Sequence, residues 1–273
     1  MTRIDYRTHT TLITGASSGL GAEFARRLAE RGSNLVLVAR RADLLEALAE
    51  ELSSKHQITA TAVPFDLTMP APGEALAEEL ARRGITVTSL VNNAGFGTHA
   101  PFRQEDPDRI QKEISLNVAG LVDVTKAFID QLTGVLVNVA STLGYQPWPN
   151  AAVYGASKAF VLSFTEALWQ ESRGSGLRVL ALSPGPTRTE FFDVVGSEDM
   201  ARGARMQTPG QVVATALDAL DRRNPPPSVV SGAVNWLGTL ISRFATRRRT
   251  VLAVGAITQR QTRTSRTGRA GTR

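Results

Sequence analysis

Cysteine is absent from the 273-residue chain, so disulfide bonds, thiolate nucleophiles and cysteine-held metal sites are excluded. The three histidines, His9, His56 and His99, stand far apart without the spacing of metal ligands, and we expect no metal site. A chain without disulfides suits a reducing compartment, and we therefore expect a cytoplasmic protein.

Long hydrophobic runs are also missing. No apolar stretch approaches the roughly 20 residues that a membrane-spanning helix needs. The start of the chain, MTRIDYRTHTTLITG, lacks the apolar segment of a signal peptide. We therefore expect neither a transmembrane segment nor export.

Acidic residues are missing from the last part of the chain. The formal net charge is +6, but residues 246–273 contain eight arginines and no Asp or Glu. Residues 1–245 therefore hold 23 Lys and Arg against 25 Asp and Glu, a net charge of −2 that gives no reason to expect a specific nucleic-acid partner. We interpret residues 1–245 as one domain and residues 246–273, rich in Arg, Thr and Gly, as a disordered tail.

What the chain does contain is a regular alternation of apolar runs and amphipathic segments. The predicted strands cover 10–14, 34–39, 59–65, 89–93, 134–140 and 177–183, with a short last strand at 228–232. The predicted helices cover 19–31, 42–55, 73–83, 106–133, 153–173 and 209–221. This order predicts an α/β fold: one domain with a doubly wound parallel sheet and helices on both faces.

A glycine-rich turn joins the first predicted strand to the first predicted helix. Gly15, Gly19 and Gly21 follow the pattern T-G-x-x-x-G-x-G. Glycine allows a tight turn, a close approach of backbone N–H groups to a pyrophosphate, and close packing of the helix on the sheet. The turn therefore predicts a dinucleotide site.

Two arginines, Arg40 and Arg41, follow the second predicted strand, where an NAD site usually offers a carboxylate to the ribose. Guanidinium groups bind a 2′-phosphate, and the pair favours NADP(H) over NAD(H). Asp66 ends the third predicted strand, where an adenine amine could be met, and the small residues of NNAG (92–95) permit close approach of the cofactor.

Tyr154 and Lys158 lie four residues apart in a predicted helix, so their side chains share one face. One interpretation is a surface pair without a role. The other is a proton-transfer pair, in which the ammonium lowers the pKa of the phenol from its ordinary value of about 10.

Four motifs in order carry a resemblance: T-G-A-S-S-G-L-G at 14–21, N-N-A-G at 92–95, Y-x-x-x-K at 154–158 and P-G at 184–185. By these the chain resembles the short-chain dehydrogenases/reductases over about residues 8–235. The resemblance implies a single Rossmann-like domain and a catalytic tetrad of Asn117, Ser141, Tyr154 and Lys158. The cofactor-binding residues predicted by the motifs and the resemblance together are Gly15, Ser17, Ser18, Gly19, Leu20, Gly21, Arg40, Arg41, Asp66, Leu67, Asn93, Ala94, Gly95, Tyr154, Lys158, Pro184, Gly185 and Thr187.

The resemblance also implies roles for the tetrad. Tyr154 would protonate the carbonyl oxygen during hydride transfer from NADPH, and Ser141 would hydrogen-bond the same oxygen. Lys158 would lower the pKa of Tyr154 and hold the nicotinamide ribose, while Asn117 would orient a water that links Lys158 to solvent. A homodimer or homotetramer through the helices at 106–133 and 153–173 is implied as well.

The segment at about 188–207 is apolar and irregular, as expected of a substrate lid. Its side chains, with two from the loop after Ser141, either line an apolar pocket or belong to the ordinary core. These residues are Phe191, Phe192, Val194, Val195, Met200, Met206, Tyr145 and Trp148.

The favoured function is NADPH-dependent interconversion of a carbonyl and a secondary alcohol, with an apolar small molecule as the expected substrate. A non-catalytic NADP-binding regulator is the alternative from another class, although Tyr154 and Lys158 are both retained. Sugar-nucleotide epimerases share the Y-x-x-x-K chemistry but call for a longer chain and G-x-x-G-x-x-G. A third alternative is peripheral membrane association through residues 233–249, an amphipathic helix followed by a basic cluster, although packing of that helix against the domain is favoured.

Overall fold

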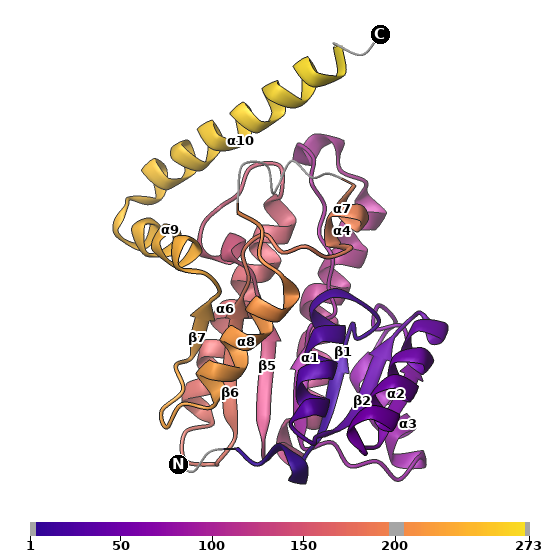
Figure 1. Ribbon diagram of the computed structural model, residues 1–273. Helices are drawn as coiled ribbons and strands as arrows, with labels where there is room; N and C mark the ends of the chain where they lie inside the picture. The colour runs from indigo at the N-terminus through magenta and orange to yellow at the C-terminus, as the bar shows by residue number, and fades with distance from the viewer. Residues whose placement is uncertain (1–3, 197–204, 271–273) are drawn as a thin grey trace.

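The computed structural model describes residues 4–196 and 205–270 and contains a seven-stranded sheet, ordered β3-β2-β1-β4-β5-β6-β7 (Figure 1). Every neighbouring pair of strands is parallel. The strands are β1 (Thr10–Thr14), β2 (Asn34–Ala39), β3 (Ala60–Pro64), β4 (Ser89–Asn92), β5 (Val135–Val139), β6 (Arg178–Ser183) and β7 (Ser228–Val230). The predicted doubly wound parallel sheet is confirmed.

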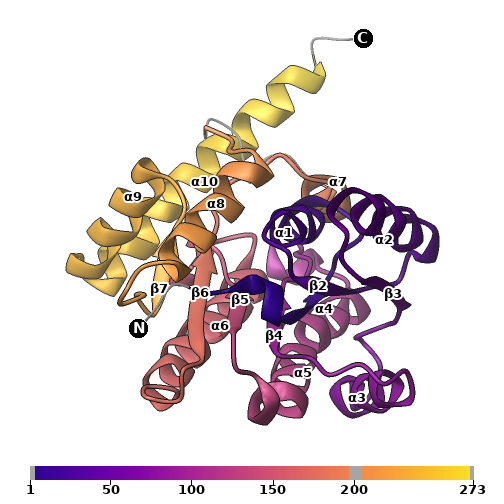
Figure 2. The same ribbon diagram turned by 60° about the horizontal axis from the view of Figure 1, so that its bottom comes forward.

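Helices cover both faces of the sheet (Figure 2). One face is covered by α1 (Gly19–Glu30), α2 (Ala42–His56) and α8 (Pro209–Leu220), and the other by α3 (Pro72–Arg82), α5 (Leu121–Phe128) and α6 (Ala152–Glu171). Each face has its own apolar core, with Phe24 in the first and Phe128 in the second. Strands β5 and β6 are buried along their whole length, because side chains on both faces are covered and their apolar runs therefore do not alternate.

The strand order reverses between β1 and β4, since the chain winds outward from β1 to β3 and then returns to the other side. At such a reversal the connections diverge and leave a crevice beyond the carboxyl ends of the strands. The turns after β1, β2, β4, β5 and β6 all open into this region.

The single helix predicted at 106–133 is interrupted in the structure. Helix α4 (Pro107–Ile114) is capped by Asp106, whose side chain accepts from the backbone N–H of Asp108. The helix continues into a π-helical turn at Ser115–Gly120 before α5. A π turn inserts one extra residue into the helical ladder and is frequent at functional sites. Asn117 lies within it.

Two helices follow β7, namely α9 (Ala233–Phe244) and α10 (Arg247–Ala270), and Figure 1 shows α10 extending away from the body. The composition predicts a disordered tail here, but the structure is helical. Val254 and Thr258 are buried, and apolar residues at helical spacing in the first half explain the ordered start. Among the helices of residues 4–196 and 205–270, none is both long and apolar enough to span a bilayer.

Candidate functional site

A cavity of about 700 Å³ opens along the carboxyl edge of the sheet. Its wall runs from Arg40, Arg41 and Asp66 after the outer strands β2 and β3 to Ser141 and Pro184 after β5 and β6. All of the predicted cofactor-binding residues except Gly21 line it. The cavity is therefore long enough to reach across six neighbouring strands.

Gly21 lies beneath the glycine-rich turn instead of facing the cavity. A Cβ atom at this position would stand 2.1 Å from the carbonyl oxygen of Gly15, so only glycine allows α1 to pack against the turn. Gly15 itself adopts a φ of +65°, which favours glycine. Ser18, which precedes α1, makes no side-chain cap, so the first turn of α1 keeps N–H groups that a phosphate can use.

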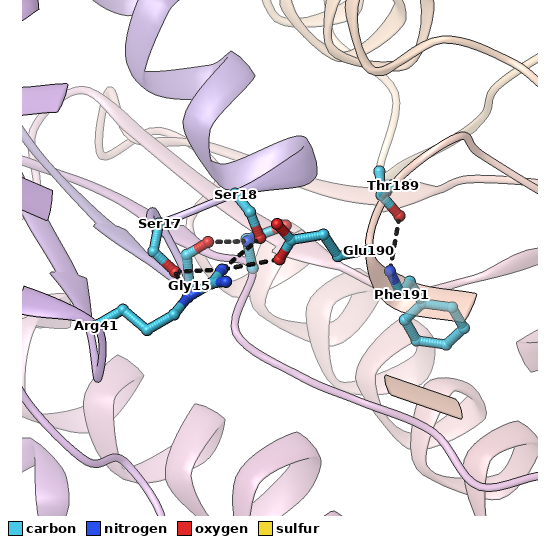
Figure 3. A network of polar contacts seen from close by, with 8 residues as sticks. Gly15, Ser17, Ser18, Arg41, Thr189, Glu190 and Phe191 are labelled. Carbon is cyan, nitrogen blue, oxygen red and sulfur yellow. Dashed lines mark hydrogen bonds and ion pairs between the residues drawn. The ribbon is translucent and has the colours of Figure 1, made fainter. Parts of the chain in front are cut away.

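Arg41 is held over this turn by three side chains (Figure 3). Its Nη2 donates to Ser18 Oγ at 2.9 Å and to Ser17 Oγ at 3.1 Å, and forms an ion pair with Glu190 Oε2 at 2.9 Å. The Arg41 guanidinium, with a contact from Ser18, lowers the pKa of the Glu190 carboxyl. Sequence reasoning missed Glu190, since its partner lies 149 positions away.

Asn93 is a structural residue of the turn as well as part of the cavity wall. Its Nδ2 donates to the carbonyl oxygens of Thr14 and Gly15, at 3.0 and 3.1 Å. Asp66 accepts from the backbone N–H and the hydroxyl of Thr68, and these bonds lower the pKa of its carboxyl. Both side chains are thereby fixed in orientation at the cavity wall.

Tyr154 and Lys158 lie on the first two turns of α6 and are both nearly buried. Lys158 Nζ lies 5.8 Å from the centre of the Tyr154 ring and donates to the carbonyl oxygen of Val139 at 2.8 Å. Ser141 follows β5, and its hydroxyl lies close enough to the phenol of Tyr154 to favour the deprotonated form. The structure thus brings these three predicted residues together, and Tyr154 and Lys158 do not form a surface pair.

The electrostatics of this group differ from the sequence expectation. Burial raises the pKa of Tyr154 well above its ordinary value of 10, and the contact with Ser141 only partly opposes this. Burial also lowers the pKa of Lys158 to about 8. Burial is thus the dominant influence on the Tyr154 phenol in this structure, and a lowering of its pKa by Lys158 stays a prediction.

Asn117 does not line the cavity but stands directly behind it. Its side chain bonds both backbone groups of Phe96, donating to the carbonyl oxygen at 2.8 Å and accepting from the N–H at 3.1 Å. A Cβ atom at Gly95 would lie 2.8 Å from Asn117 Oδ1 and 3.4 Å from Lys158 Nζ. Because Gly95 has no side chain, Asn117 and Lys158 can both lie close to its backbone.

Glu113, one helical turn before Asn117, is a site residue that sequence reasoning missed. Its side chain is completely buried. Thr98 partly stabilises the charged carboxylate, but among the residues that the structure describes neither carboxyl oxygen has a partner in full hydrogen-bond geometry. Burial raises the pKa of this carboxyl to about 7, and its charge raises the pKa of both Tyr154 and Lys158. A charged residue four positions before Asn117, on the same helix face, was the available signal.

The two ends of the segment predicted to be a lid, at about 188–207, lie together beside the cavity. A parallel bridge joins Thr187 to Gln207 and so brings the two ends of the segment together. Between them, α7 (Phe191–Val195) places the ring of Phe191 5.4 Å from that of Tyr154. Arg109 of α4, which also lines the cavity, donates to the carbonyl oxygen of Val194.

Only part of the predicted pocket set faces the cavity. Phe191, Phe192 and Val194 line it, as does Leu143. Val195 and Trp148 pack behind them in a small core cluster, Tyr145 packs in another, and Met206 is not part of the wall. Met200 lies outside the described residues.

The sequence profile of the short chain dehydrogenase family matches residues 9–199. Sulfoacetaldehyde reductase 2 of Chromohalobacter salexigens is 42% identical over 197 residues, which cover 70% of this chain and 77% of that protein. An NADP-dependent 3-hydroxy acid dehydrogenase of Schizosaccharomyces pombe is 30% identical over 236 residues, covering 82% and 90%. A short-chain dehydrogenase of Sphingobium yanoikuyae, solved in complex with NADPH, has a TM-score of 0.75 at 34% identity and covers 86% of this chain and 93% of its own. The chain therefore belongs to the short-chain dehydrogenase family of oxidoreductases.

Proposed function

We propose that this protein is an NADP(H)-dependent oxidoreductase that interconverts a carbonyl group and a secondary alcohol. The observation that carries the proposal is the single cavity that holds Arg40 and Arg41 at one end and Ser141, Tyr154 and Lys158 at the other. A dinucleotide spans such a distance, and the uncapped N-terminus of α1 lies between the two ends. The residues present thus fit NADP(H).

NADP(H), when bound, supplies or accepts the hydride at the carbonyl carbon. The protein supplies the proton. Because burial raises the pKa of Tyr154, its phenol is protonated at neutral pH and can donate to the carbonyl oxygen. Ser141 positions that oxygen, and Lys158, anchored on Val139, keeps a positive charge beside the phenolate that forms.

The preference for NADP(H) over NAD(H) rests on the two arginines, and Arg41 is the better placed. Three oxygen atoms already orient its guanidinium over the glycine-rich turn. A charge-assisted contact to a 2′-phosphate contributes on the order of 1.5–3 kcal/mol, so Arg41→Ala should weaken NADPH roughly 10- to 100-fold and leave NADH nearly unchanged. Equal weakening of both cofactors, measured by fluorescence titration, would refute this assignment.

The substrate proposal is an apolar carbonyl compound. Leu143, Phe191, Phe192 and Val194 surround the cavity next to Tyr154. The protein should be a homodimer through α4–α5 and α6, because Phe160 and Phe164 stack on the outer side of α6 with Phe160 exposed. Light scattering of the purified protein at micromolar concentration tests this.

The decisive experiment measures NADPH consumption by the purified protein against a panel of ketones, aldehydes and 3-oxoacyl esters. Reduction of apolar carbonyl compounds in the panel supports the proposal. The same assay with NADH in place of NADPH tests the cofactor preference. Tight NADPH binding without turnover of any panel member would favour the regulator of the same fold instead.

A further inference from the structure

Helix α9 contacts the domain through its polar face, whereas the helices that cover the sheet contact it through their apolar faces. Its polar side carries the contacts: Asn235 Nδ2 donates to the carbonyl oxygen of Ser231 at 2.8 Å and to Gln207 Oε1 at 3.3 Å, and Thr239 is buried. Asn235 also lies directly against Gly185, where a Cβ atom would be 2.2 Å from its Nδ2. The polar face of an amphipathic helix is thus the face turned toward the protein.

The apolar side of α9 is exposed. The exposed fractions of its large apolar side chains are 80% for Val234, 53% for Trp236, 51% for Leu237, 60% for Ile241 and 85% for Phe244. Residues three, four and seven positions apart share one side of a helix, so these five lie within one half of its circumference. Exposed apolar side chains gathered in this way mark an interaction surface, and the expected packing of this face against the domain is wrong.

Positive charge adjoins this surface. Arg247, Arg248 and Arg249 follow α9 at the start of α10 and are all exposed. Residues 246–273 contain five further arginines and no acidic residue. Two apolar side chains of α10, Leu252 and Ile257, are also half exposed or more. The surface therefore combines an apolar helix face with a cationic segment that contains no acidic residue.

We propose that the exposed face of α9, with Arg247–Arg249, is a docking surface for a lipid bilayer that contains anionic headgroups. Trp, Phe and Leu on one face enter the acyl boundary, while arginines bind the negative surface. A second copy of the chain fits less well, because its α9 and residues 246–273 contain no acidic residue that could pair with the arginines. The proposal does not depend on the reductase activity.

Helix α9 lies next to the cavity, so docking through α9 would also place the cavity near the bilayer. Helix α9 contacts the short 3₁₀ helix Thr142–Tyr145, which directly follows Ser141, and Asn235 supports Gly185 in the cavity wall. Figure 1 shows α9 and α10 at the same end of the molecule as α7. A docked molecule would therefore hold the lid end of its cavity near the bilayer, where apolar substrates concentrate.

The test is flotation of the full-length protein with vesicles of phosphatidylcholine alone, or with about one third phosphatidylglycerol. Wild-type protein should float with the anionic vesicles and not with the neutral ones. Ile241→Ser/Phe244→Ser should lower the bound fraction at least tenfold. Arg247→Gln/Arg248→Gln should weaken binding by about 25-fold, from roughly fivefold for each of the two arginines near an anionic surface. NADPH binding measured on each variant establishes that the fold is intact.

Two matched controls distinguish binding through this surface from nonspecific binding to vesicles. Phe102→Ser removes an exposed aromatic ring from another part of the molecule, and Arg222→Gln/Arg223→Gln removes two exposed charges elsewhere. Both should bind anionic vesicles like the wild type. Three results would overturn the proposal: no binding of the wild type, binding that survives Ile241→Ser/Phe244→Ser, or an oligomer in light scattering that this double variant dissociates. The last result would assign the face to a second copy of the chain.

Discussion

Helices α6 and α9 are both rich in apolar residues, yet they contact the domain in opposite ways. Helix α6 buries Val161 completely, together with Tyr154 and Lys158 on the side facing the sheet. Helix α9 buries Thr239 and exposes Val234. The comparison shows that apolar periodicity predicts a helix and its apolar face, but the partner of that face has to come from the tertiary structure.

The difference extends to the polar groups of the two regions. Around α6, the groups lose their solvent, so their pKa values shift far and their geometry is fixed by packing. At the lid and the C-terminal helices the charged groups remain in water, as in the half-exposed pair of Arg41 and Glu190. Substitutions should therefore have large effects near α6 and small effects at the periphery.

The largest effect is expected at Tyr154 on α6. Tyr154→Phe removes one hydroxyl and leaves the ring packed against Phe191, so fold and NADPH binding should persist. Loss of the proton donor should lower kcat for carbonyl reduction about 10²- to 10⁴-fold in steady-state assays. Tyr145→Phe, in the loop after Ser141 but outside the cavity wall, should keep wild-type activity. Comparable losses in both variants would show that Tyr154 has no special role.

A matched pair of valines tests the comparison directly through stability. Val161→Ser places a hydroxyl in a fully buried site of α6 and should lower the free energy of unfolding by about 2–4 kcal/mol. Val234→Ser, at an 80% exposed site of α9, should change it by no more than about 0.5 kcal/mol. Urea denaturation measures both. A large loss at Val234 would mean that the outer face of α9 is covered in solution.

The sequence was sufficient for the elements whose signals are local. The buried strands, the glycine-rich turn before α1 and the spacing of Tyr154 and Lys158 each depend on neighbouring residues, so the sheet and these two side chains could be predicted. Arg41 followed because it comes just after a strand of a parallel sheet, whereas Ser141 was implied by the resemblance to a known family.

Features that depend on distant contacts could not be predicted in this way. The ion pair of Glu190 with Arg41 joins two loops that only the complete fold brings together. The pKa of Tyr154 depends on how many atoms surround the phenol, and no spacing rule gives that number, so the dominant effect of burial could not be predicted. The π turn at Asn117 and the exposed apolar face of α9 likewise depend on how distant elements pack together, which local sequence patterns do not give.

Glu113 provides a pH test within the α6 region. Its folded pKa of about 7 lies above the ordinary carboxyl value of 4.5, so the folded state binds the extra proton between these pH values. The contribution of this proton to the free energy of unfolding is fully present below about pH 4.5. It is lost as the pH rises through 7, a decrease of up to about 3 kcal/mol. Lys158, Tyr154 and Glu105 are the titratable groups that interact with it.

Glu113→Gln should therefore become progressively more stable than the wild type between pH 5 and pH 8, in urea denaturation across that range. Because the Glu113 charge raises the pKa of Tyr154, the same substitution should shift the alcohol-oxidation profile to lower pH. Glu46→Gln, at an exposed position of α2, should change neither curve. A pH-independent difference between Glu113→Gln and wild type would show that Glu113 does not titrate in this range.

The smallest effect is expected at the periphery, where Glu190 competes for Arg41. Glu190→Gln removes the negative charge from the ion pair but keeps the side chain that lies over the glycine-rich turn (Figure 3). A 2′-phosphate would then meet an unpaired guanidinium, and NADPH should bind about two- to fivefold more tightly, as expected from an exposed ion pair. NADH should bind as before, and the gain should shrink at high salt because exposed charges are screened. Asp193→Asn removes an equal charge from an exposed position of α7 without touching Arg41 and should change neither affinity. If isothermal titration showed the same gain for NADH, or the same gain in Asp193→Asn, Glu190 would act only through the general charge of the lid and not through Arg41.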